Sequence, residues 1–188
     1  MKLKFIVFSL MFLMVACPAP EEDIYINLNS FDIQASCSNR ENDFSDTITC
    51  SDTFKIYLDF SSSQITQSAR SSTGIGVAYA AQAPFVYLQN DVIRCSILNT
   101  EAFDNYPKET EMNDYFELCI DNSNWIHNLS LIEGINESAR LQYFQNIRPY
   151  LKLIDSINYE GKIVVQLELS NGTQLSDSTQ NIILNFSE

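Results

Sequence analysis

The sequence predicts a mainly β fold of the α+β class, an antiparallel β-sandwich-like domain with a helical insertion around residues 111–150. Residues 54–60 alternate between apolar and polar side chains, which is the two-residue period of a half-buried strand. Residues 162–169 are rich in β-branched and apolar side chains, and the Asn171-Gly172 dipeptide after them is a strong hairpin signal. The chain is 45% hydrophobic and 12% aromatic, which is enough apolar material to fill one core.

The predicted strands begin at residue 24. Two short alternating segments open the folded part, and in the clearest strand Phe54, Ile56 and Leu58 share one face with Phe60. Residues 61–72 are rich in Ser, Gln and Thr without periodicity, which predicts a loop or an irregular edge strand. The other predicted strands are 24–29, 31–35, 74–81 (a strand or a buried extended segment), 84–88, 91–98, 162–169, 174–176 and 181–186.

The middle of the chain carries the predicted helices. Asn113 and Asp114 are typical N-cap residues, and they predict a short helix that runs to Ile120. Residues 137–148 repeat apolar side chains at helical spacing, and Pro149 then excludes a continuing helix. The Asn-Gly dipeptide near the end predicts a two-residue hairpin turn of type I′.

The first residues predict export. Lys2 and Lys4 precede an apolar run of about 12 residues, against the roughly 20 that a membrane-spanning helix needs. The run ends at Ala16, a small residue suited to a cleavage site. We therefore divide the chain into a signal peptide (1–16), an acidic tether (17–23) and a single β-rich domain (24–188).

The residues around the cleavage point resemble the lipobox of bacterial lipoproteins, in which the cysteine is lipidated and becomes the mature N-terminus. Cys17 stands at the lipidated position, and Met14 stands where that family usually has Leu. The resemblance implies an outer-membrane lipid anchor, with the body on the periplasmic face or at the cell surface. A simply secreted chain is the alternative.

The charge of the chain limits its partners. The formal net charge is −13, and loss of Lys2 and Lys4 with the signal peptide leaves −15. Such a body repels phosphate backbones, so nucleic acid is excluded as a partner. It also repels anionic lipid headgroups, so attachment to the membrane must come from the lipid rather than from charge.

Four further cysteines suggest two disulfides in an exported chain. A local Cys37–Cys50 bridge around the polar residues 38–49 is the pairing we expect, with Cys95–Cys119 as the second. Four buried free thiols are the alternative. The absence of a C-x-x-C motif from the sequence leaves a thioredoxin-type redox site without support.

The chain as a whole resembles the uncharacterised exported lipoproteins of Bacteroidetes. The shared features are the lipobox, the β-rich start, the Asn-Asp-Tyr-Phe segment at 113–116 and the closing Asn-Gly hairpin. The resemblance implies an immunoglobulin-like or related β-sandwich, and it carries over no catalytic residue. It also implies a surface-transport signal at Glu21-Glu22-Asp23. Candidate O-glycosylation acceptors within a three-residue motif of that group are Thr47, Ser156 and Ser178.

The sequence offers few groups for catalysis. His127 is the only histidine, which excludes a site built from several histidines, and no G-x-S-x-G motif accompanies it. We therefore predict no catalytic residue, no cofactor and no metal. Neighbouring carboxylates support a glycan-acting hydrolase only as a lesser alternative. These pairs are Glu21/Glu22, Glu101/Asp104 and Glu109/Glu111.

Aromatic residues in the polar middle segment are the candidate ligand contacts. Tyr106, Tyr115 and Trp125 lie among Asn and Asp side chains, which suits sugar stacking and protein contacts. The alternative is that they cap the core. We expect a non-enzymatic envelope lipoprotein that binds a glycan or an envelope protein. A structural or assembly subunit of an envelope complex is the main alternative.

Overall fold

The computed structural model describes residues 23–37, 47–65, 85–103, 106–120, 129–145 and 147–186. Its contacts divide the chain into a smaller unit (1–26 and 64–87) and a larger unit (27–63 and 88–188). The chain is mainly β, as predicted, and it has one α-helix in the described ranges. The elements are β1 (Ile24–Cys37), β2 (Thr47–Cys50), β3 (Phe54–Ile65), β4 (Val86–Leu88), β5 (Val92–Asn99), η1 (Asn113–Tyr115), β6 (Phe116–Ile120), α2 (Leu131–Gln145), β7 (Pro149–Leu153), β8 (Tyr159–Gly161), β9 (Ile163–Leu169), β10 (Gln174–Ser178) and β11 (Asn181–Leu184).

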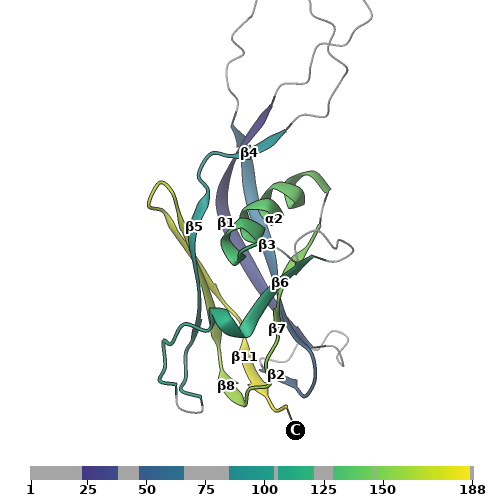
Figure 1. Ribbon diagram of the computed structural model, residues 1–188, viewed down its shortest axis with the longest axis vertical. Coiled ribbons are helices and arrows are strands. Elements are labelled where there is room, and N and C mark those ends of the chain that lie inside the picture. Colours follow the sequence, from purple (N-terminus) through teal and green to yellow (C-terminus); the bar gives the residue numbers. More distant parts are fainter. Residues whose placement is uncertain are drawn as a thin grey trace, which may run out of the picture. The chain divides into compact units, whose positions relative to one another are not determined.

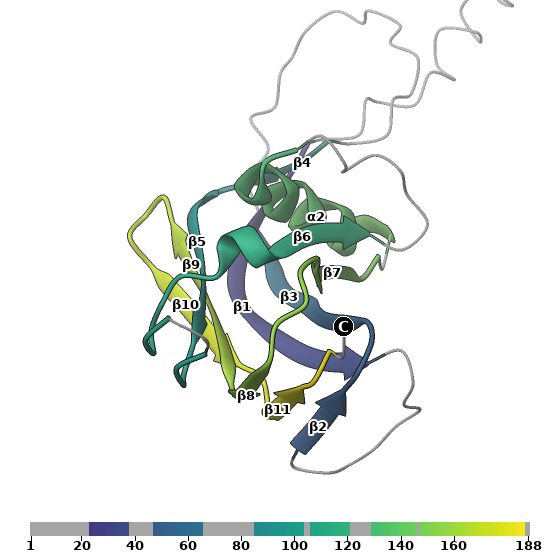
Figure 2. The ribbon, with the colours of Figure 1, turned by 60° about the horizontal axis from the view of Figure 1, so that its bottom comes forward.

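Three sheets can be followed in Figure 1, in the strand orders β4-β1-β3-β7-β6, β10-β9-β5 and β2-β11-β8. β7 pairs antiparallel with β3 and β6, and β9 pairs antiparallel with β5 and β10. β2 and β11, however, are parallel (Figure 2). This parallel pair is an exception among the otherwise antiparallel pairs named here, which agree with the antiparallel sandwich-like fold that we predicted.

The alternation of residues 54–60 orients β3 as predicted. Phe54, Ile56 and Leu58 are at most 1% exposed. They share one hydrophobic core with Val165 and Leu167 of the second sheet. Each such side chain contributes about 1.5–3 kcal/mol by leaving water. The inner faces of these two sheets thus contribute to one core.

Helix α2 begins earlier in the chain than the sequence analysis predicted. It starts at Leu131 rather than 137, after a capping box in which Glu133 N donates to Ser130 Oγ (3.3 Å) and Ser130 N donates to Glu133 Oε2 (3.0 Å). The hydrogen bonds from Ser130 lower the pKa of the Glu133 carboxyl. Ile135 and Ala139 are buried against the rest of the larger unit. The Ser-x-x-Glu signal at 130–133 is the feature that the periodicity argument missed.

The predicted short helix from residue 113 to 120 is mostly strand. Only Asn113–Tyr115 is helical, as a 3₁₀ turn, and β6 follows directly. The Asn113 side chain does not cap the turn. Its Nδ2 instead donates to Cys95 O (2.8 Å), and its Oδ1 accepts from Ile97 N (2.8 Å). The helical part of the insertion around 111–150 is therefore this turn and α2.

Asparagine side chains cover the edge of β5 that faces away from β9. Asn136 of α2 accepts from Val92 N (2.8 Å) and donates to Val92 O (2.9 Å). The Asn113 side chain bonds the same edge further along the strand, at Cys95 O and Ile97 N. At the end of the strand a backbone hydrogen bond takes over, from Glu109 N to Asn99 O (2.8 Å). These bonds satisfy backbone groups that a neighbouring strand would otherwise satisfy.

The hairpin between β9 and β10 has a three-residue loop rather than the predicted type I′ turn. Leu169 N donates to Thr173 O (2.9 Å), and Gly172 has a φ of +83°. Asn171 keeps a negative φ, and its Oδ1 accepts from Thr173 N (2.9 Å). This is the arrangement of a type I turn followed by a left-handed glycine.

Replacing Gly161 by Ala should lower the free energy of unfolding by about 2 kcal/mol. Gly161 has a φ of +152°, and an added Cβ would lie 2.6 Å from Tyr159 Oη. That hydroxyl cannot move freely because it bonds Lys162 O and Thr100 N. Urea unfolding would measure the loss. Gly172→Ala is the control: its Cβ would meet nothing within 4 Å, so only the backbone cost of about 1 kcal/mol remains. Equal losses would contradict the steric account.

No helix in the described part of the chain is long and apolar enough to cross a membrane. The predicted signal peptide, Cys17 and most of the acidic tether lie outside the described residues.

Candidate functional site

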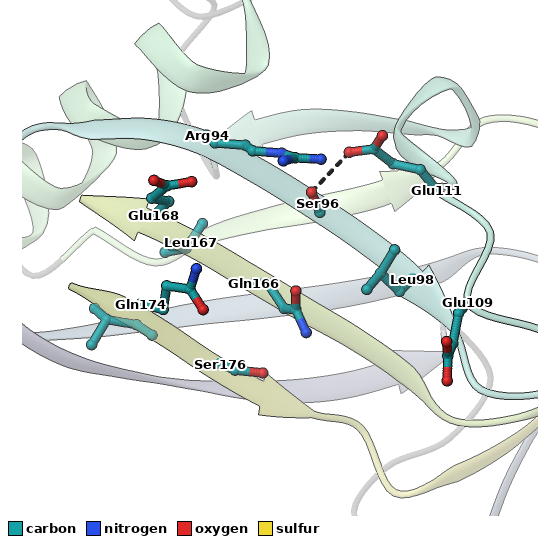
Figure 3. Close-up of a pocket in the computed structure, with 11 residues that line it drawn as sticks. Arg94, Ser96, Leu98, Glu109, Glu111, Gln166, Leu167, Glu168, Gln174 and Ser176 are labelled. Carbon is teal, nitrogen blue, oxygen red and sulfur yellow. Dashed lines mark hydrogen bonds between the residues drawn. The ribbon is translucent and has the colours of Figure 1, made fainter. Parts of the chain in front are cut away.

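A groove of about 300 Å³ lies on the second sheet (Figure 3). β5 contributes Arg94, Ser96 and Leu98, β9 contributes Gln166, Leu167 and Glu168, β10 contributes Gln174, Leu175 and Ser176, and a neighbouring loop contributes Glu109 and Glu111.

Strand register places the polar side chains of the groove in rows. Val165, Leu167 and Leu169 are buried, so the alternating Gln166 and Glu168 project away from the core. In one row, Glu168 is paired with Arg94 on β5 and with Gln174 on β10. In the next, Gln166 is paired in the same way with Ser96 and Ser176. The floor of the groove is therefore a rigid sheet that presents amide and hydroxyl groups between charged ones.

The loop that carries Glu109 and Glu111 forms one wall. Glu111 bridges to Leu98 of β5, and its Oε1 accepts from Ser96 Oγ (2.8 Å; dashed in Figure 3). Glu109 has a φ of +63°, an uncommon backbone conformation for a residue with a side chain. Such strain persists only where surrounding structure over-determines it.

Asn99 supplies that surrounding structure. Its side chain is buried, and its Nδ2 donates to Glu101 O (2.6 Å) and Pro107 O (2.9 Å). Its Oδ1 accepts from Thr110 N (2.6 Å). One asparagine at the end of β5 therefore fixes both ends of the loop that walls the groove.

The groove carries more negative than positive charge. Glu109, Glu111 and Glu168 outnumber Arg94, which forms no ion pair with any described acid. Within the described ranges, no group of three His, Cys, Asp or Glu side chains is arranged to hold a metal ion. The field of these charges favours neutral or cationic ligands over anions.

Two of the three predicted aromatic contacts lie together, outside the lining of the groove. Tyr106 stacks on the buried Phe103 (ring centroids 5.1 Å), and Tyr115 meets both rings edge-on. Tyr115 also packs against the core, which agrees with the alternative that these rings cap it. Tyr106 remains 43% exposed. Trp125 and His127 lie outside the described residues.

The cysteines pair only in part as the sequence analysis predicted. Cys37 at the end of β1 and Cys50 at the end of β2 form a disulfide, with Cα atoms 5.7 Å apart. Cys95 and Cys119 are free thiols, so the predicted second bridge is not formed. Cys95 points into the core from β5, whereas Cys119 is half-exposed on β6, a strand of a different sheet.

We expect the stability of the protein to fall above pH 9 because of Cys95. Burial, with a smaller effect of the Glu111 charge, raises the pKa of Cys95 from 9.0 to about 12. Between these pH values the unfolded thiol ionises while the folded thiol stays neutral, so ionisation favours unfolding as the pH rises. The loss should reach about 1–2 kcal/mol by roughly pH 10.5. Urea unfolding of wild type and Cys95→Ala would isolate this effect, and an equal alkaline loss in both would contradict it.

The candidate O-glycosylation acceptors lie in the described part of the chain. Ser156 and Ser178 are exposed, and Thr47 is half-buried at the start of β2. The backbone amide of Ser178 donates to Asp177 Oδ1 (2.8 Å).

The sequence analysis found one pair of groove residues and missed the others. Glu109 and Glu111 had been noted as neighbouring carboxylates, and both line the groove. Arg94, Gln166 and Ser176 were not identified, because they come from three different strands. In each strand, every second side chain points away from the core, and these outward positions are the sequence signal that could have identified them.

The chain matches no protein-family model, no curated protein and no solved structure. These comparisons therefore assign the chain to no family. A functional proposal rests on the geometry of the groove.

Proposed function

We propose that this chain is a non-enzymatic, membrane-anchored envelope lipoprotein whose body binds a short glycan in the groove on β5, β9 and β10. The observation that carries the proposal is the groove itself, in which rows of polar side chains cross a rigid sheet. The anchor is proposed from the apolar leader that ends at Cys17. The Cys37–Cys50 disulfide supports an exported location, because disulfides persist in oxidising compartments.

The second row of the groove, formed by Ser96, Gln166 and Ser176, suits a polyhydroxylated ligand. Ser96, Gln166 and Ser176 offer neutral donors and acceptors side by side, at strand spacings of about 4.8 Å. Glu111 and Arg94 lie beside this row and would fix the orientation of charged substituents. A volume of about 300 Å³ is at the low end for ligand pockets, which limits the bound part to one or two sugar rings.

A glycan-acting hydrolase remains the second candidate because Glu109 and Glu111 line the same groove. Hydrolysis of a glycosidic bond needs two carboxyl groups on either side of the bond. Binding without turnover and binding with turnover are therefore to be measured in one experiment.

The test is calorimetric titration of the full-length protein in detergent with neutral, amino and acidic oligosaccharides, with product analysis of each mixture. We expect neutral or amino sugars to bind, and Gln166→Ala to weaken binding by about tenfold, the equivalent of one lost hydrogen bond. Gln180→Ala is the matched control, because Gln180 is not among the lining residues. Released sugar would favour the hydrolase.

Two results would contradict the glycan proposal. One is unchanged affinity in Gln166→Ala. The other is failure of every sugar to bind while the protein co-purifies with a membrane complex, which would favour the assembly subunit. Protease shaving of intact cells would then separate the surface from the periplasmic face, because only a surface body is lost before lysis.

A further inference from the structure

Three aromatic rings lie together in the smaller unit. Tyr25 stacks on Tyr87 with ring centroids 5.3 Å apart, and Phe85 lies 6.4 Å from Tyr87. Ile24 N donates to Phe85 O (2.8 Å), which joins the start of β1 to the segment at β4. We call Tyr25, Phe85 and Tyr87 the aromatic cluster.

The aromatic cluster is exposed. Phe85 is 58% and Tyr87 is 40% exposed, and both belong to the few large apolar side chains with such exposure in the described ranges. Asp23 is the only charged residue among the described residues of this unit. Aromatic side chains with one apolar and one polar end are typical of membrane interfaces.

The chain itself limits how far the aromatic cluster can lie from a lipid at Cys17. Tyr25 lies eight positions after Cys17, and a fully extended chain spans at most about 3.6 Å per residue. Tyr25 therefore stays within about 29 Å of the anchor. Such a short tether gives the rings a high effective concentration at the membrane surface, so weak individual contacts suffice.

We propose that the aromatic cluster docks into the interfacial layer of the membrane that holds the Cys17 lipid. The proposal rests on the proposed anchor and goes beyond it, because it assigns a second contact with the membrane. The acidic body cannot supply that contact by charge, since a net charge of −15 repels anionic headgroups. Aromatic rings supply it without charge.

The test uses the full-length lipidated protein in vesicles of dioleoyl phosphatidylcholine, with and without brominated chains that quench tryptophan at short range. Trp125→Phe removes the only native tryptophan, and Phe85→Trp then reports from the aromatic cluster. Ile154→Trp in the same background is the matched control, since Ile154 is 50% exposed in the larger unit.

We expect brominated lipid to lower the Phe85→Trp emission about twofold, as for a side chain in the acyl boundary, and to leave Ile154→Trp nearly unchanged. Adding Tyr25→Ser and Tyr87→Ser should weaken the quenching at position 85. The mass of the N-terminal peptide, taken from the same sample, shows whether Cys17 is acylated.

Three outcomes would overturn the proposal. If Cys17 is acylated but position 85 is not quenched, the anchor is supported and membrane docking of the aromatic cluster is contradicted. The aromatic cluster would then be a contact for a protein partner or a second copy of the chain. Equal quenching at both positions would mean that the whole body lies on the membrane without a specific docking surface. An unmodified Cys17 removes the anchor on which both proposals rest.

Discussion

Replacing Asn99 by Asp should lower the free energy of unfolding by about 3–4 kcal/mol, a large part of the stability of a typical domain. The change keeps the shape of the side chain and removes its two donors. Glu101 O and Pro107 O, at 2.6 and 2.9 Å, would then face an oxygen in a buried site. The cost combines two unsatisfied carbonyls with a buried negative charge.

Urea unfolding at pH 7 would measure this loss, and Asn171→Asp is the control. Asn171 is exposed and uses only its acceptor, toward Thr173 N, so Asp can replace it. Burial raises the pKa of the carboxyl introduced at position 99, so part of the lost stability should return toward about pH 5. Similar losses at the two positions would show that the donors of Asn99 are not responsible.

The Asn99→Asp variant should also lose affinity for any groove ligand. The loop that carries Glu109 and Glu111 depends on Asn99 at both ends. Folded protein that binds normally would mean that the loop wall does not take part in binding.

Removing the Cys37–Cys50 disulfide should cost about 3 kcal/mol. The two cysteines are 13 residues apart, and the chain-entropy model gives this value for closing a loop of that length in the unfolded chain. β2 would then depend on its four-residue parallel pairing with β11. We expect the amides of β2 to lose protection from hydrogen exchange before those of β3.

Urea unfolding of the Cys37→Ala/Cys50→Ala variant would measure the cost. Reductant should destabilise the wild type by a similar amount and leave the double variant unchanged. Cys119→Ala is the thiol control, because Cys119 is free and only half-buried. A response of the double variant to reductant would point to another cause.

Sequence patterns predicted the elements whose side chains alternate over a long run. β3 and β9 alternate buried and more exposed residues along their apolar runs, as a period of two indicates, whereas β5 buries Cys95, Ser96 and Ile97 in succession. β7 and β8 were missed because runs of five and three residues carry little periodicity. The prediction of a helix over β6 is wrong because Asn113, a residue typical of helix N-caps, uses its side chain to bond the backbone of β5.

The groove was harder to predict than the strands. Arg94, Gln166 and Ser176 meet only because β9 lies between β5 and β10. That strand order is set by the tertiary structure and is not visible in the periodicity of any single strand. Glu109 and Glu111 are close in sequence, so proximity alone suggested them. The Cys37–Cys50 bridge was predictable for the same reason, because the two cysteines close a short segment. The Cys95–Cys119 pairing had no such local signal, and the structure leaves Cys95 buried and Cys119 half-exposed as free thiols.

The asparagine side chains along β5 have a consequence for solubility. An open strand edge is a template onto which another molecule can add a strand, and that addition is a route to aggregation. Asn113 and Asn136 occupy the donors and acceptors that such an incoming strand would need. An edge closed by short side chains lets neighbouring copies touch without joining their sheets.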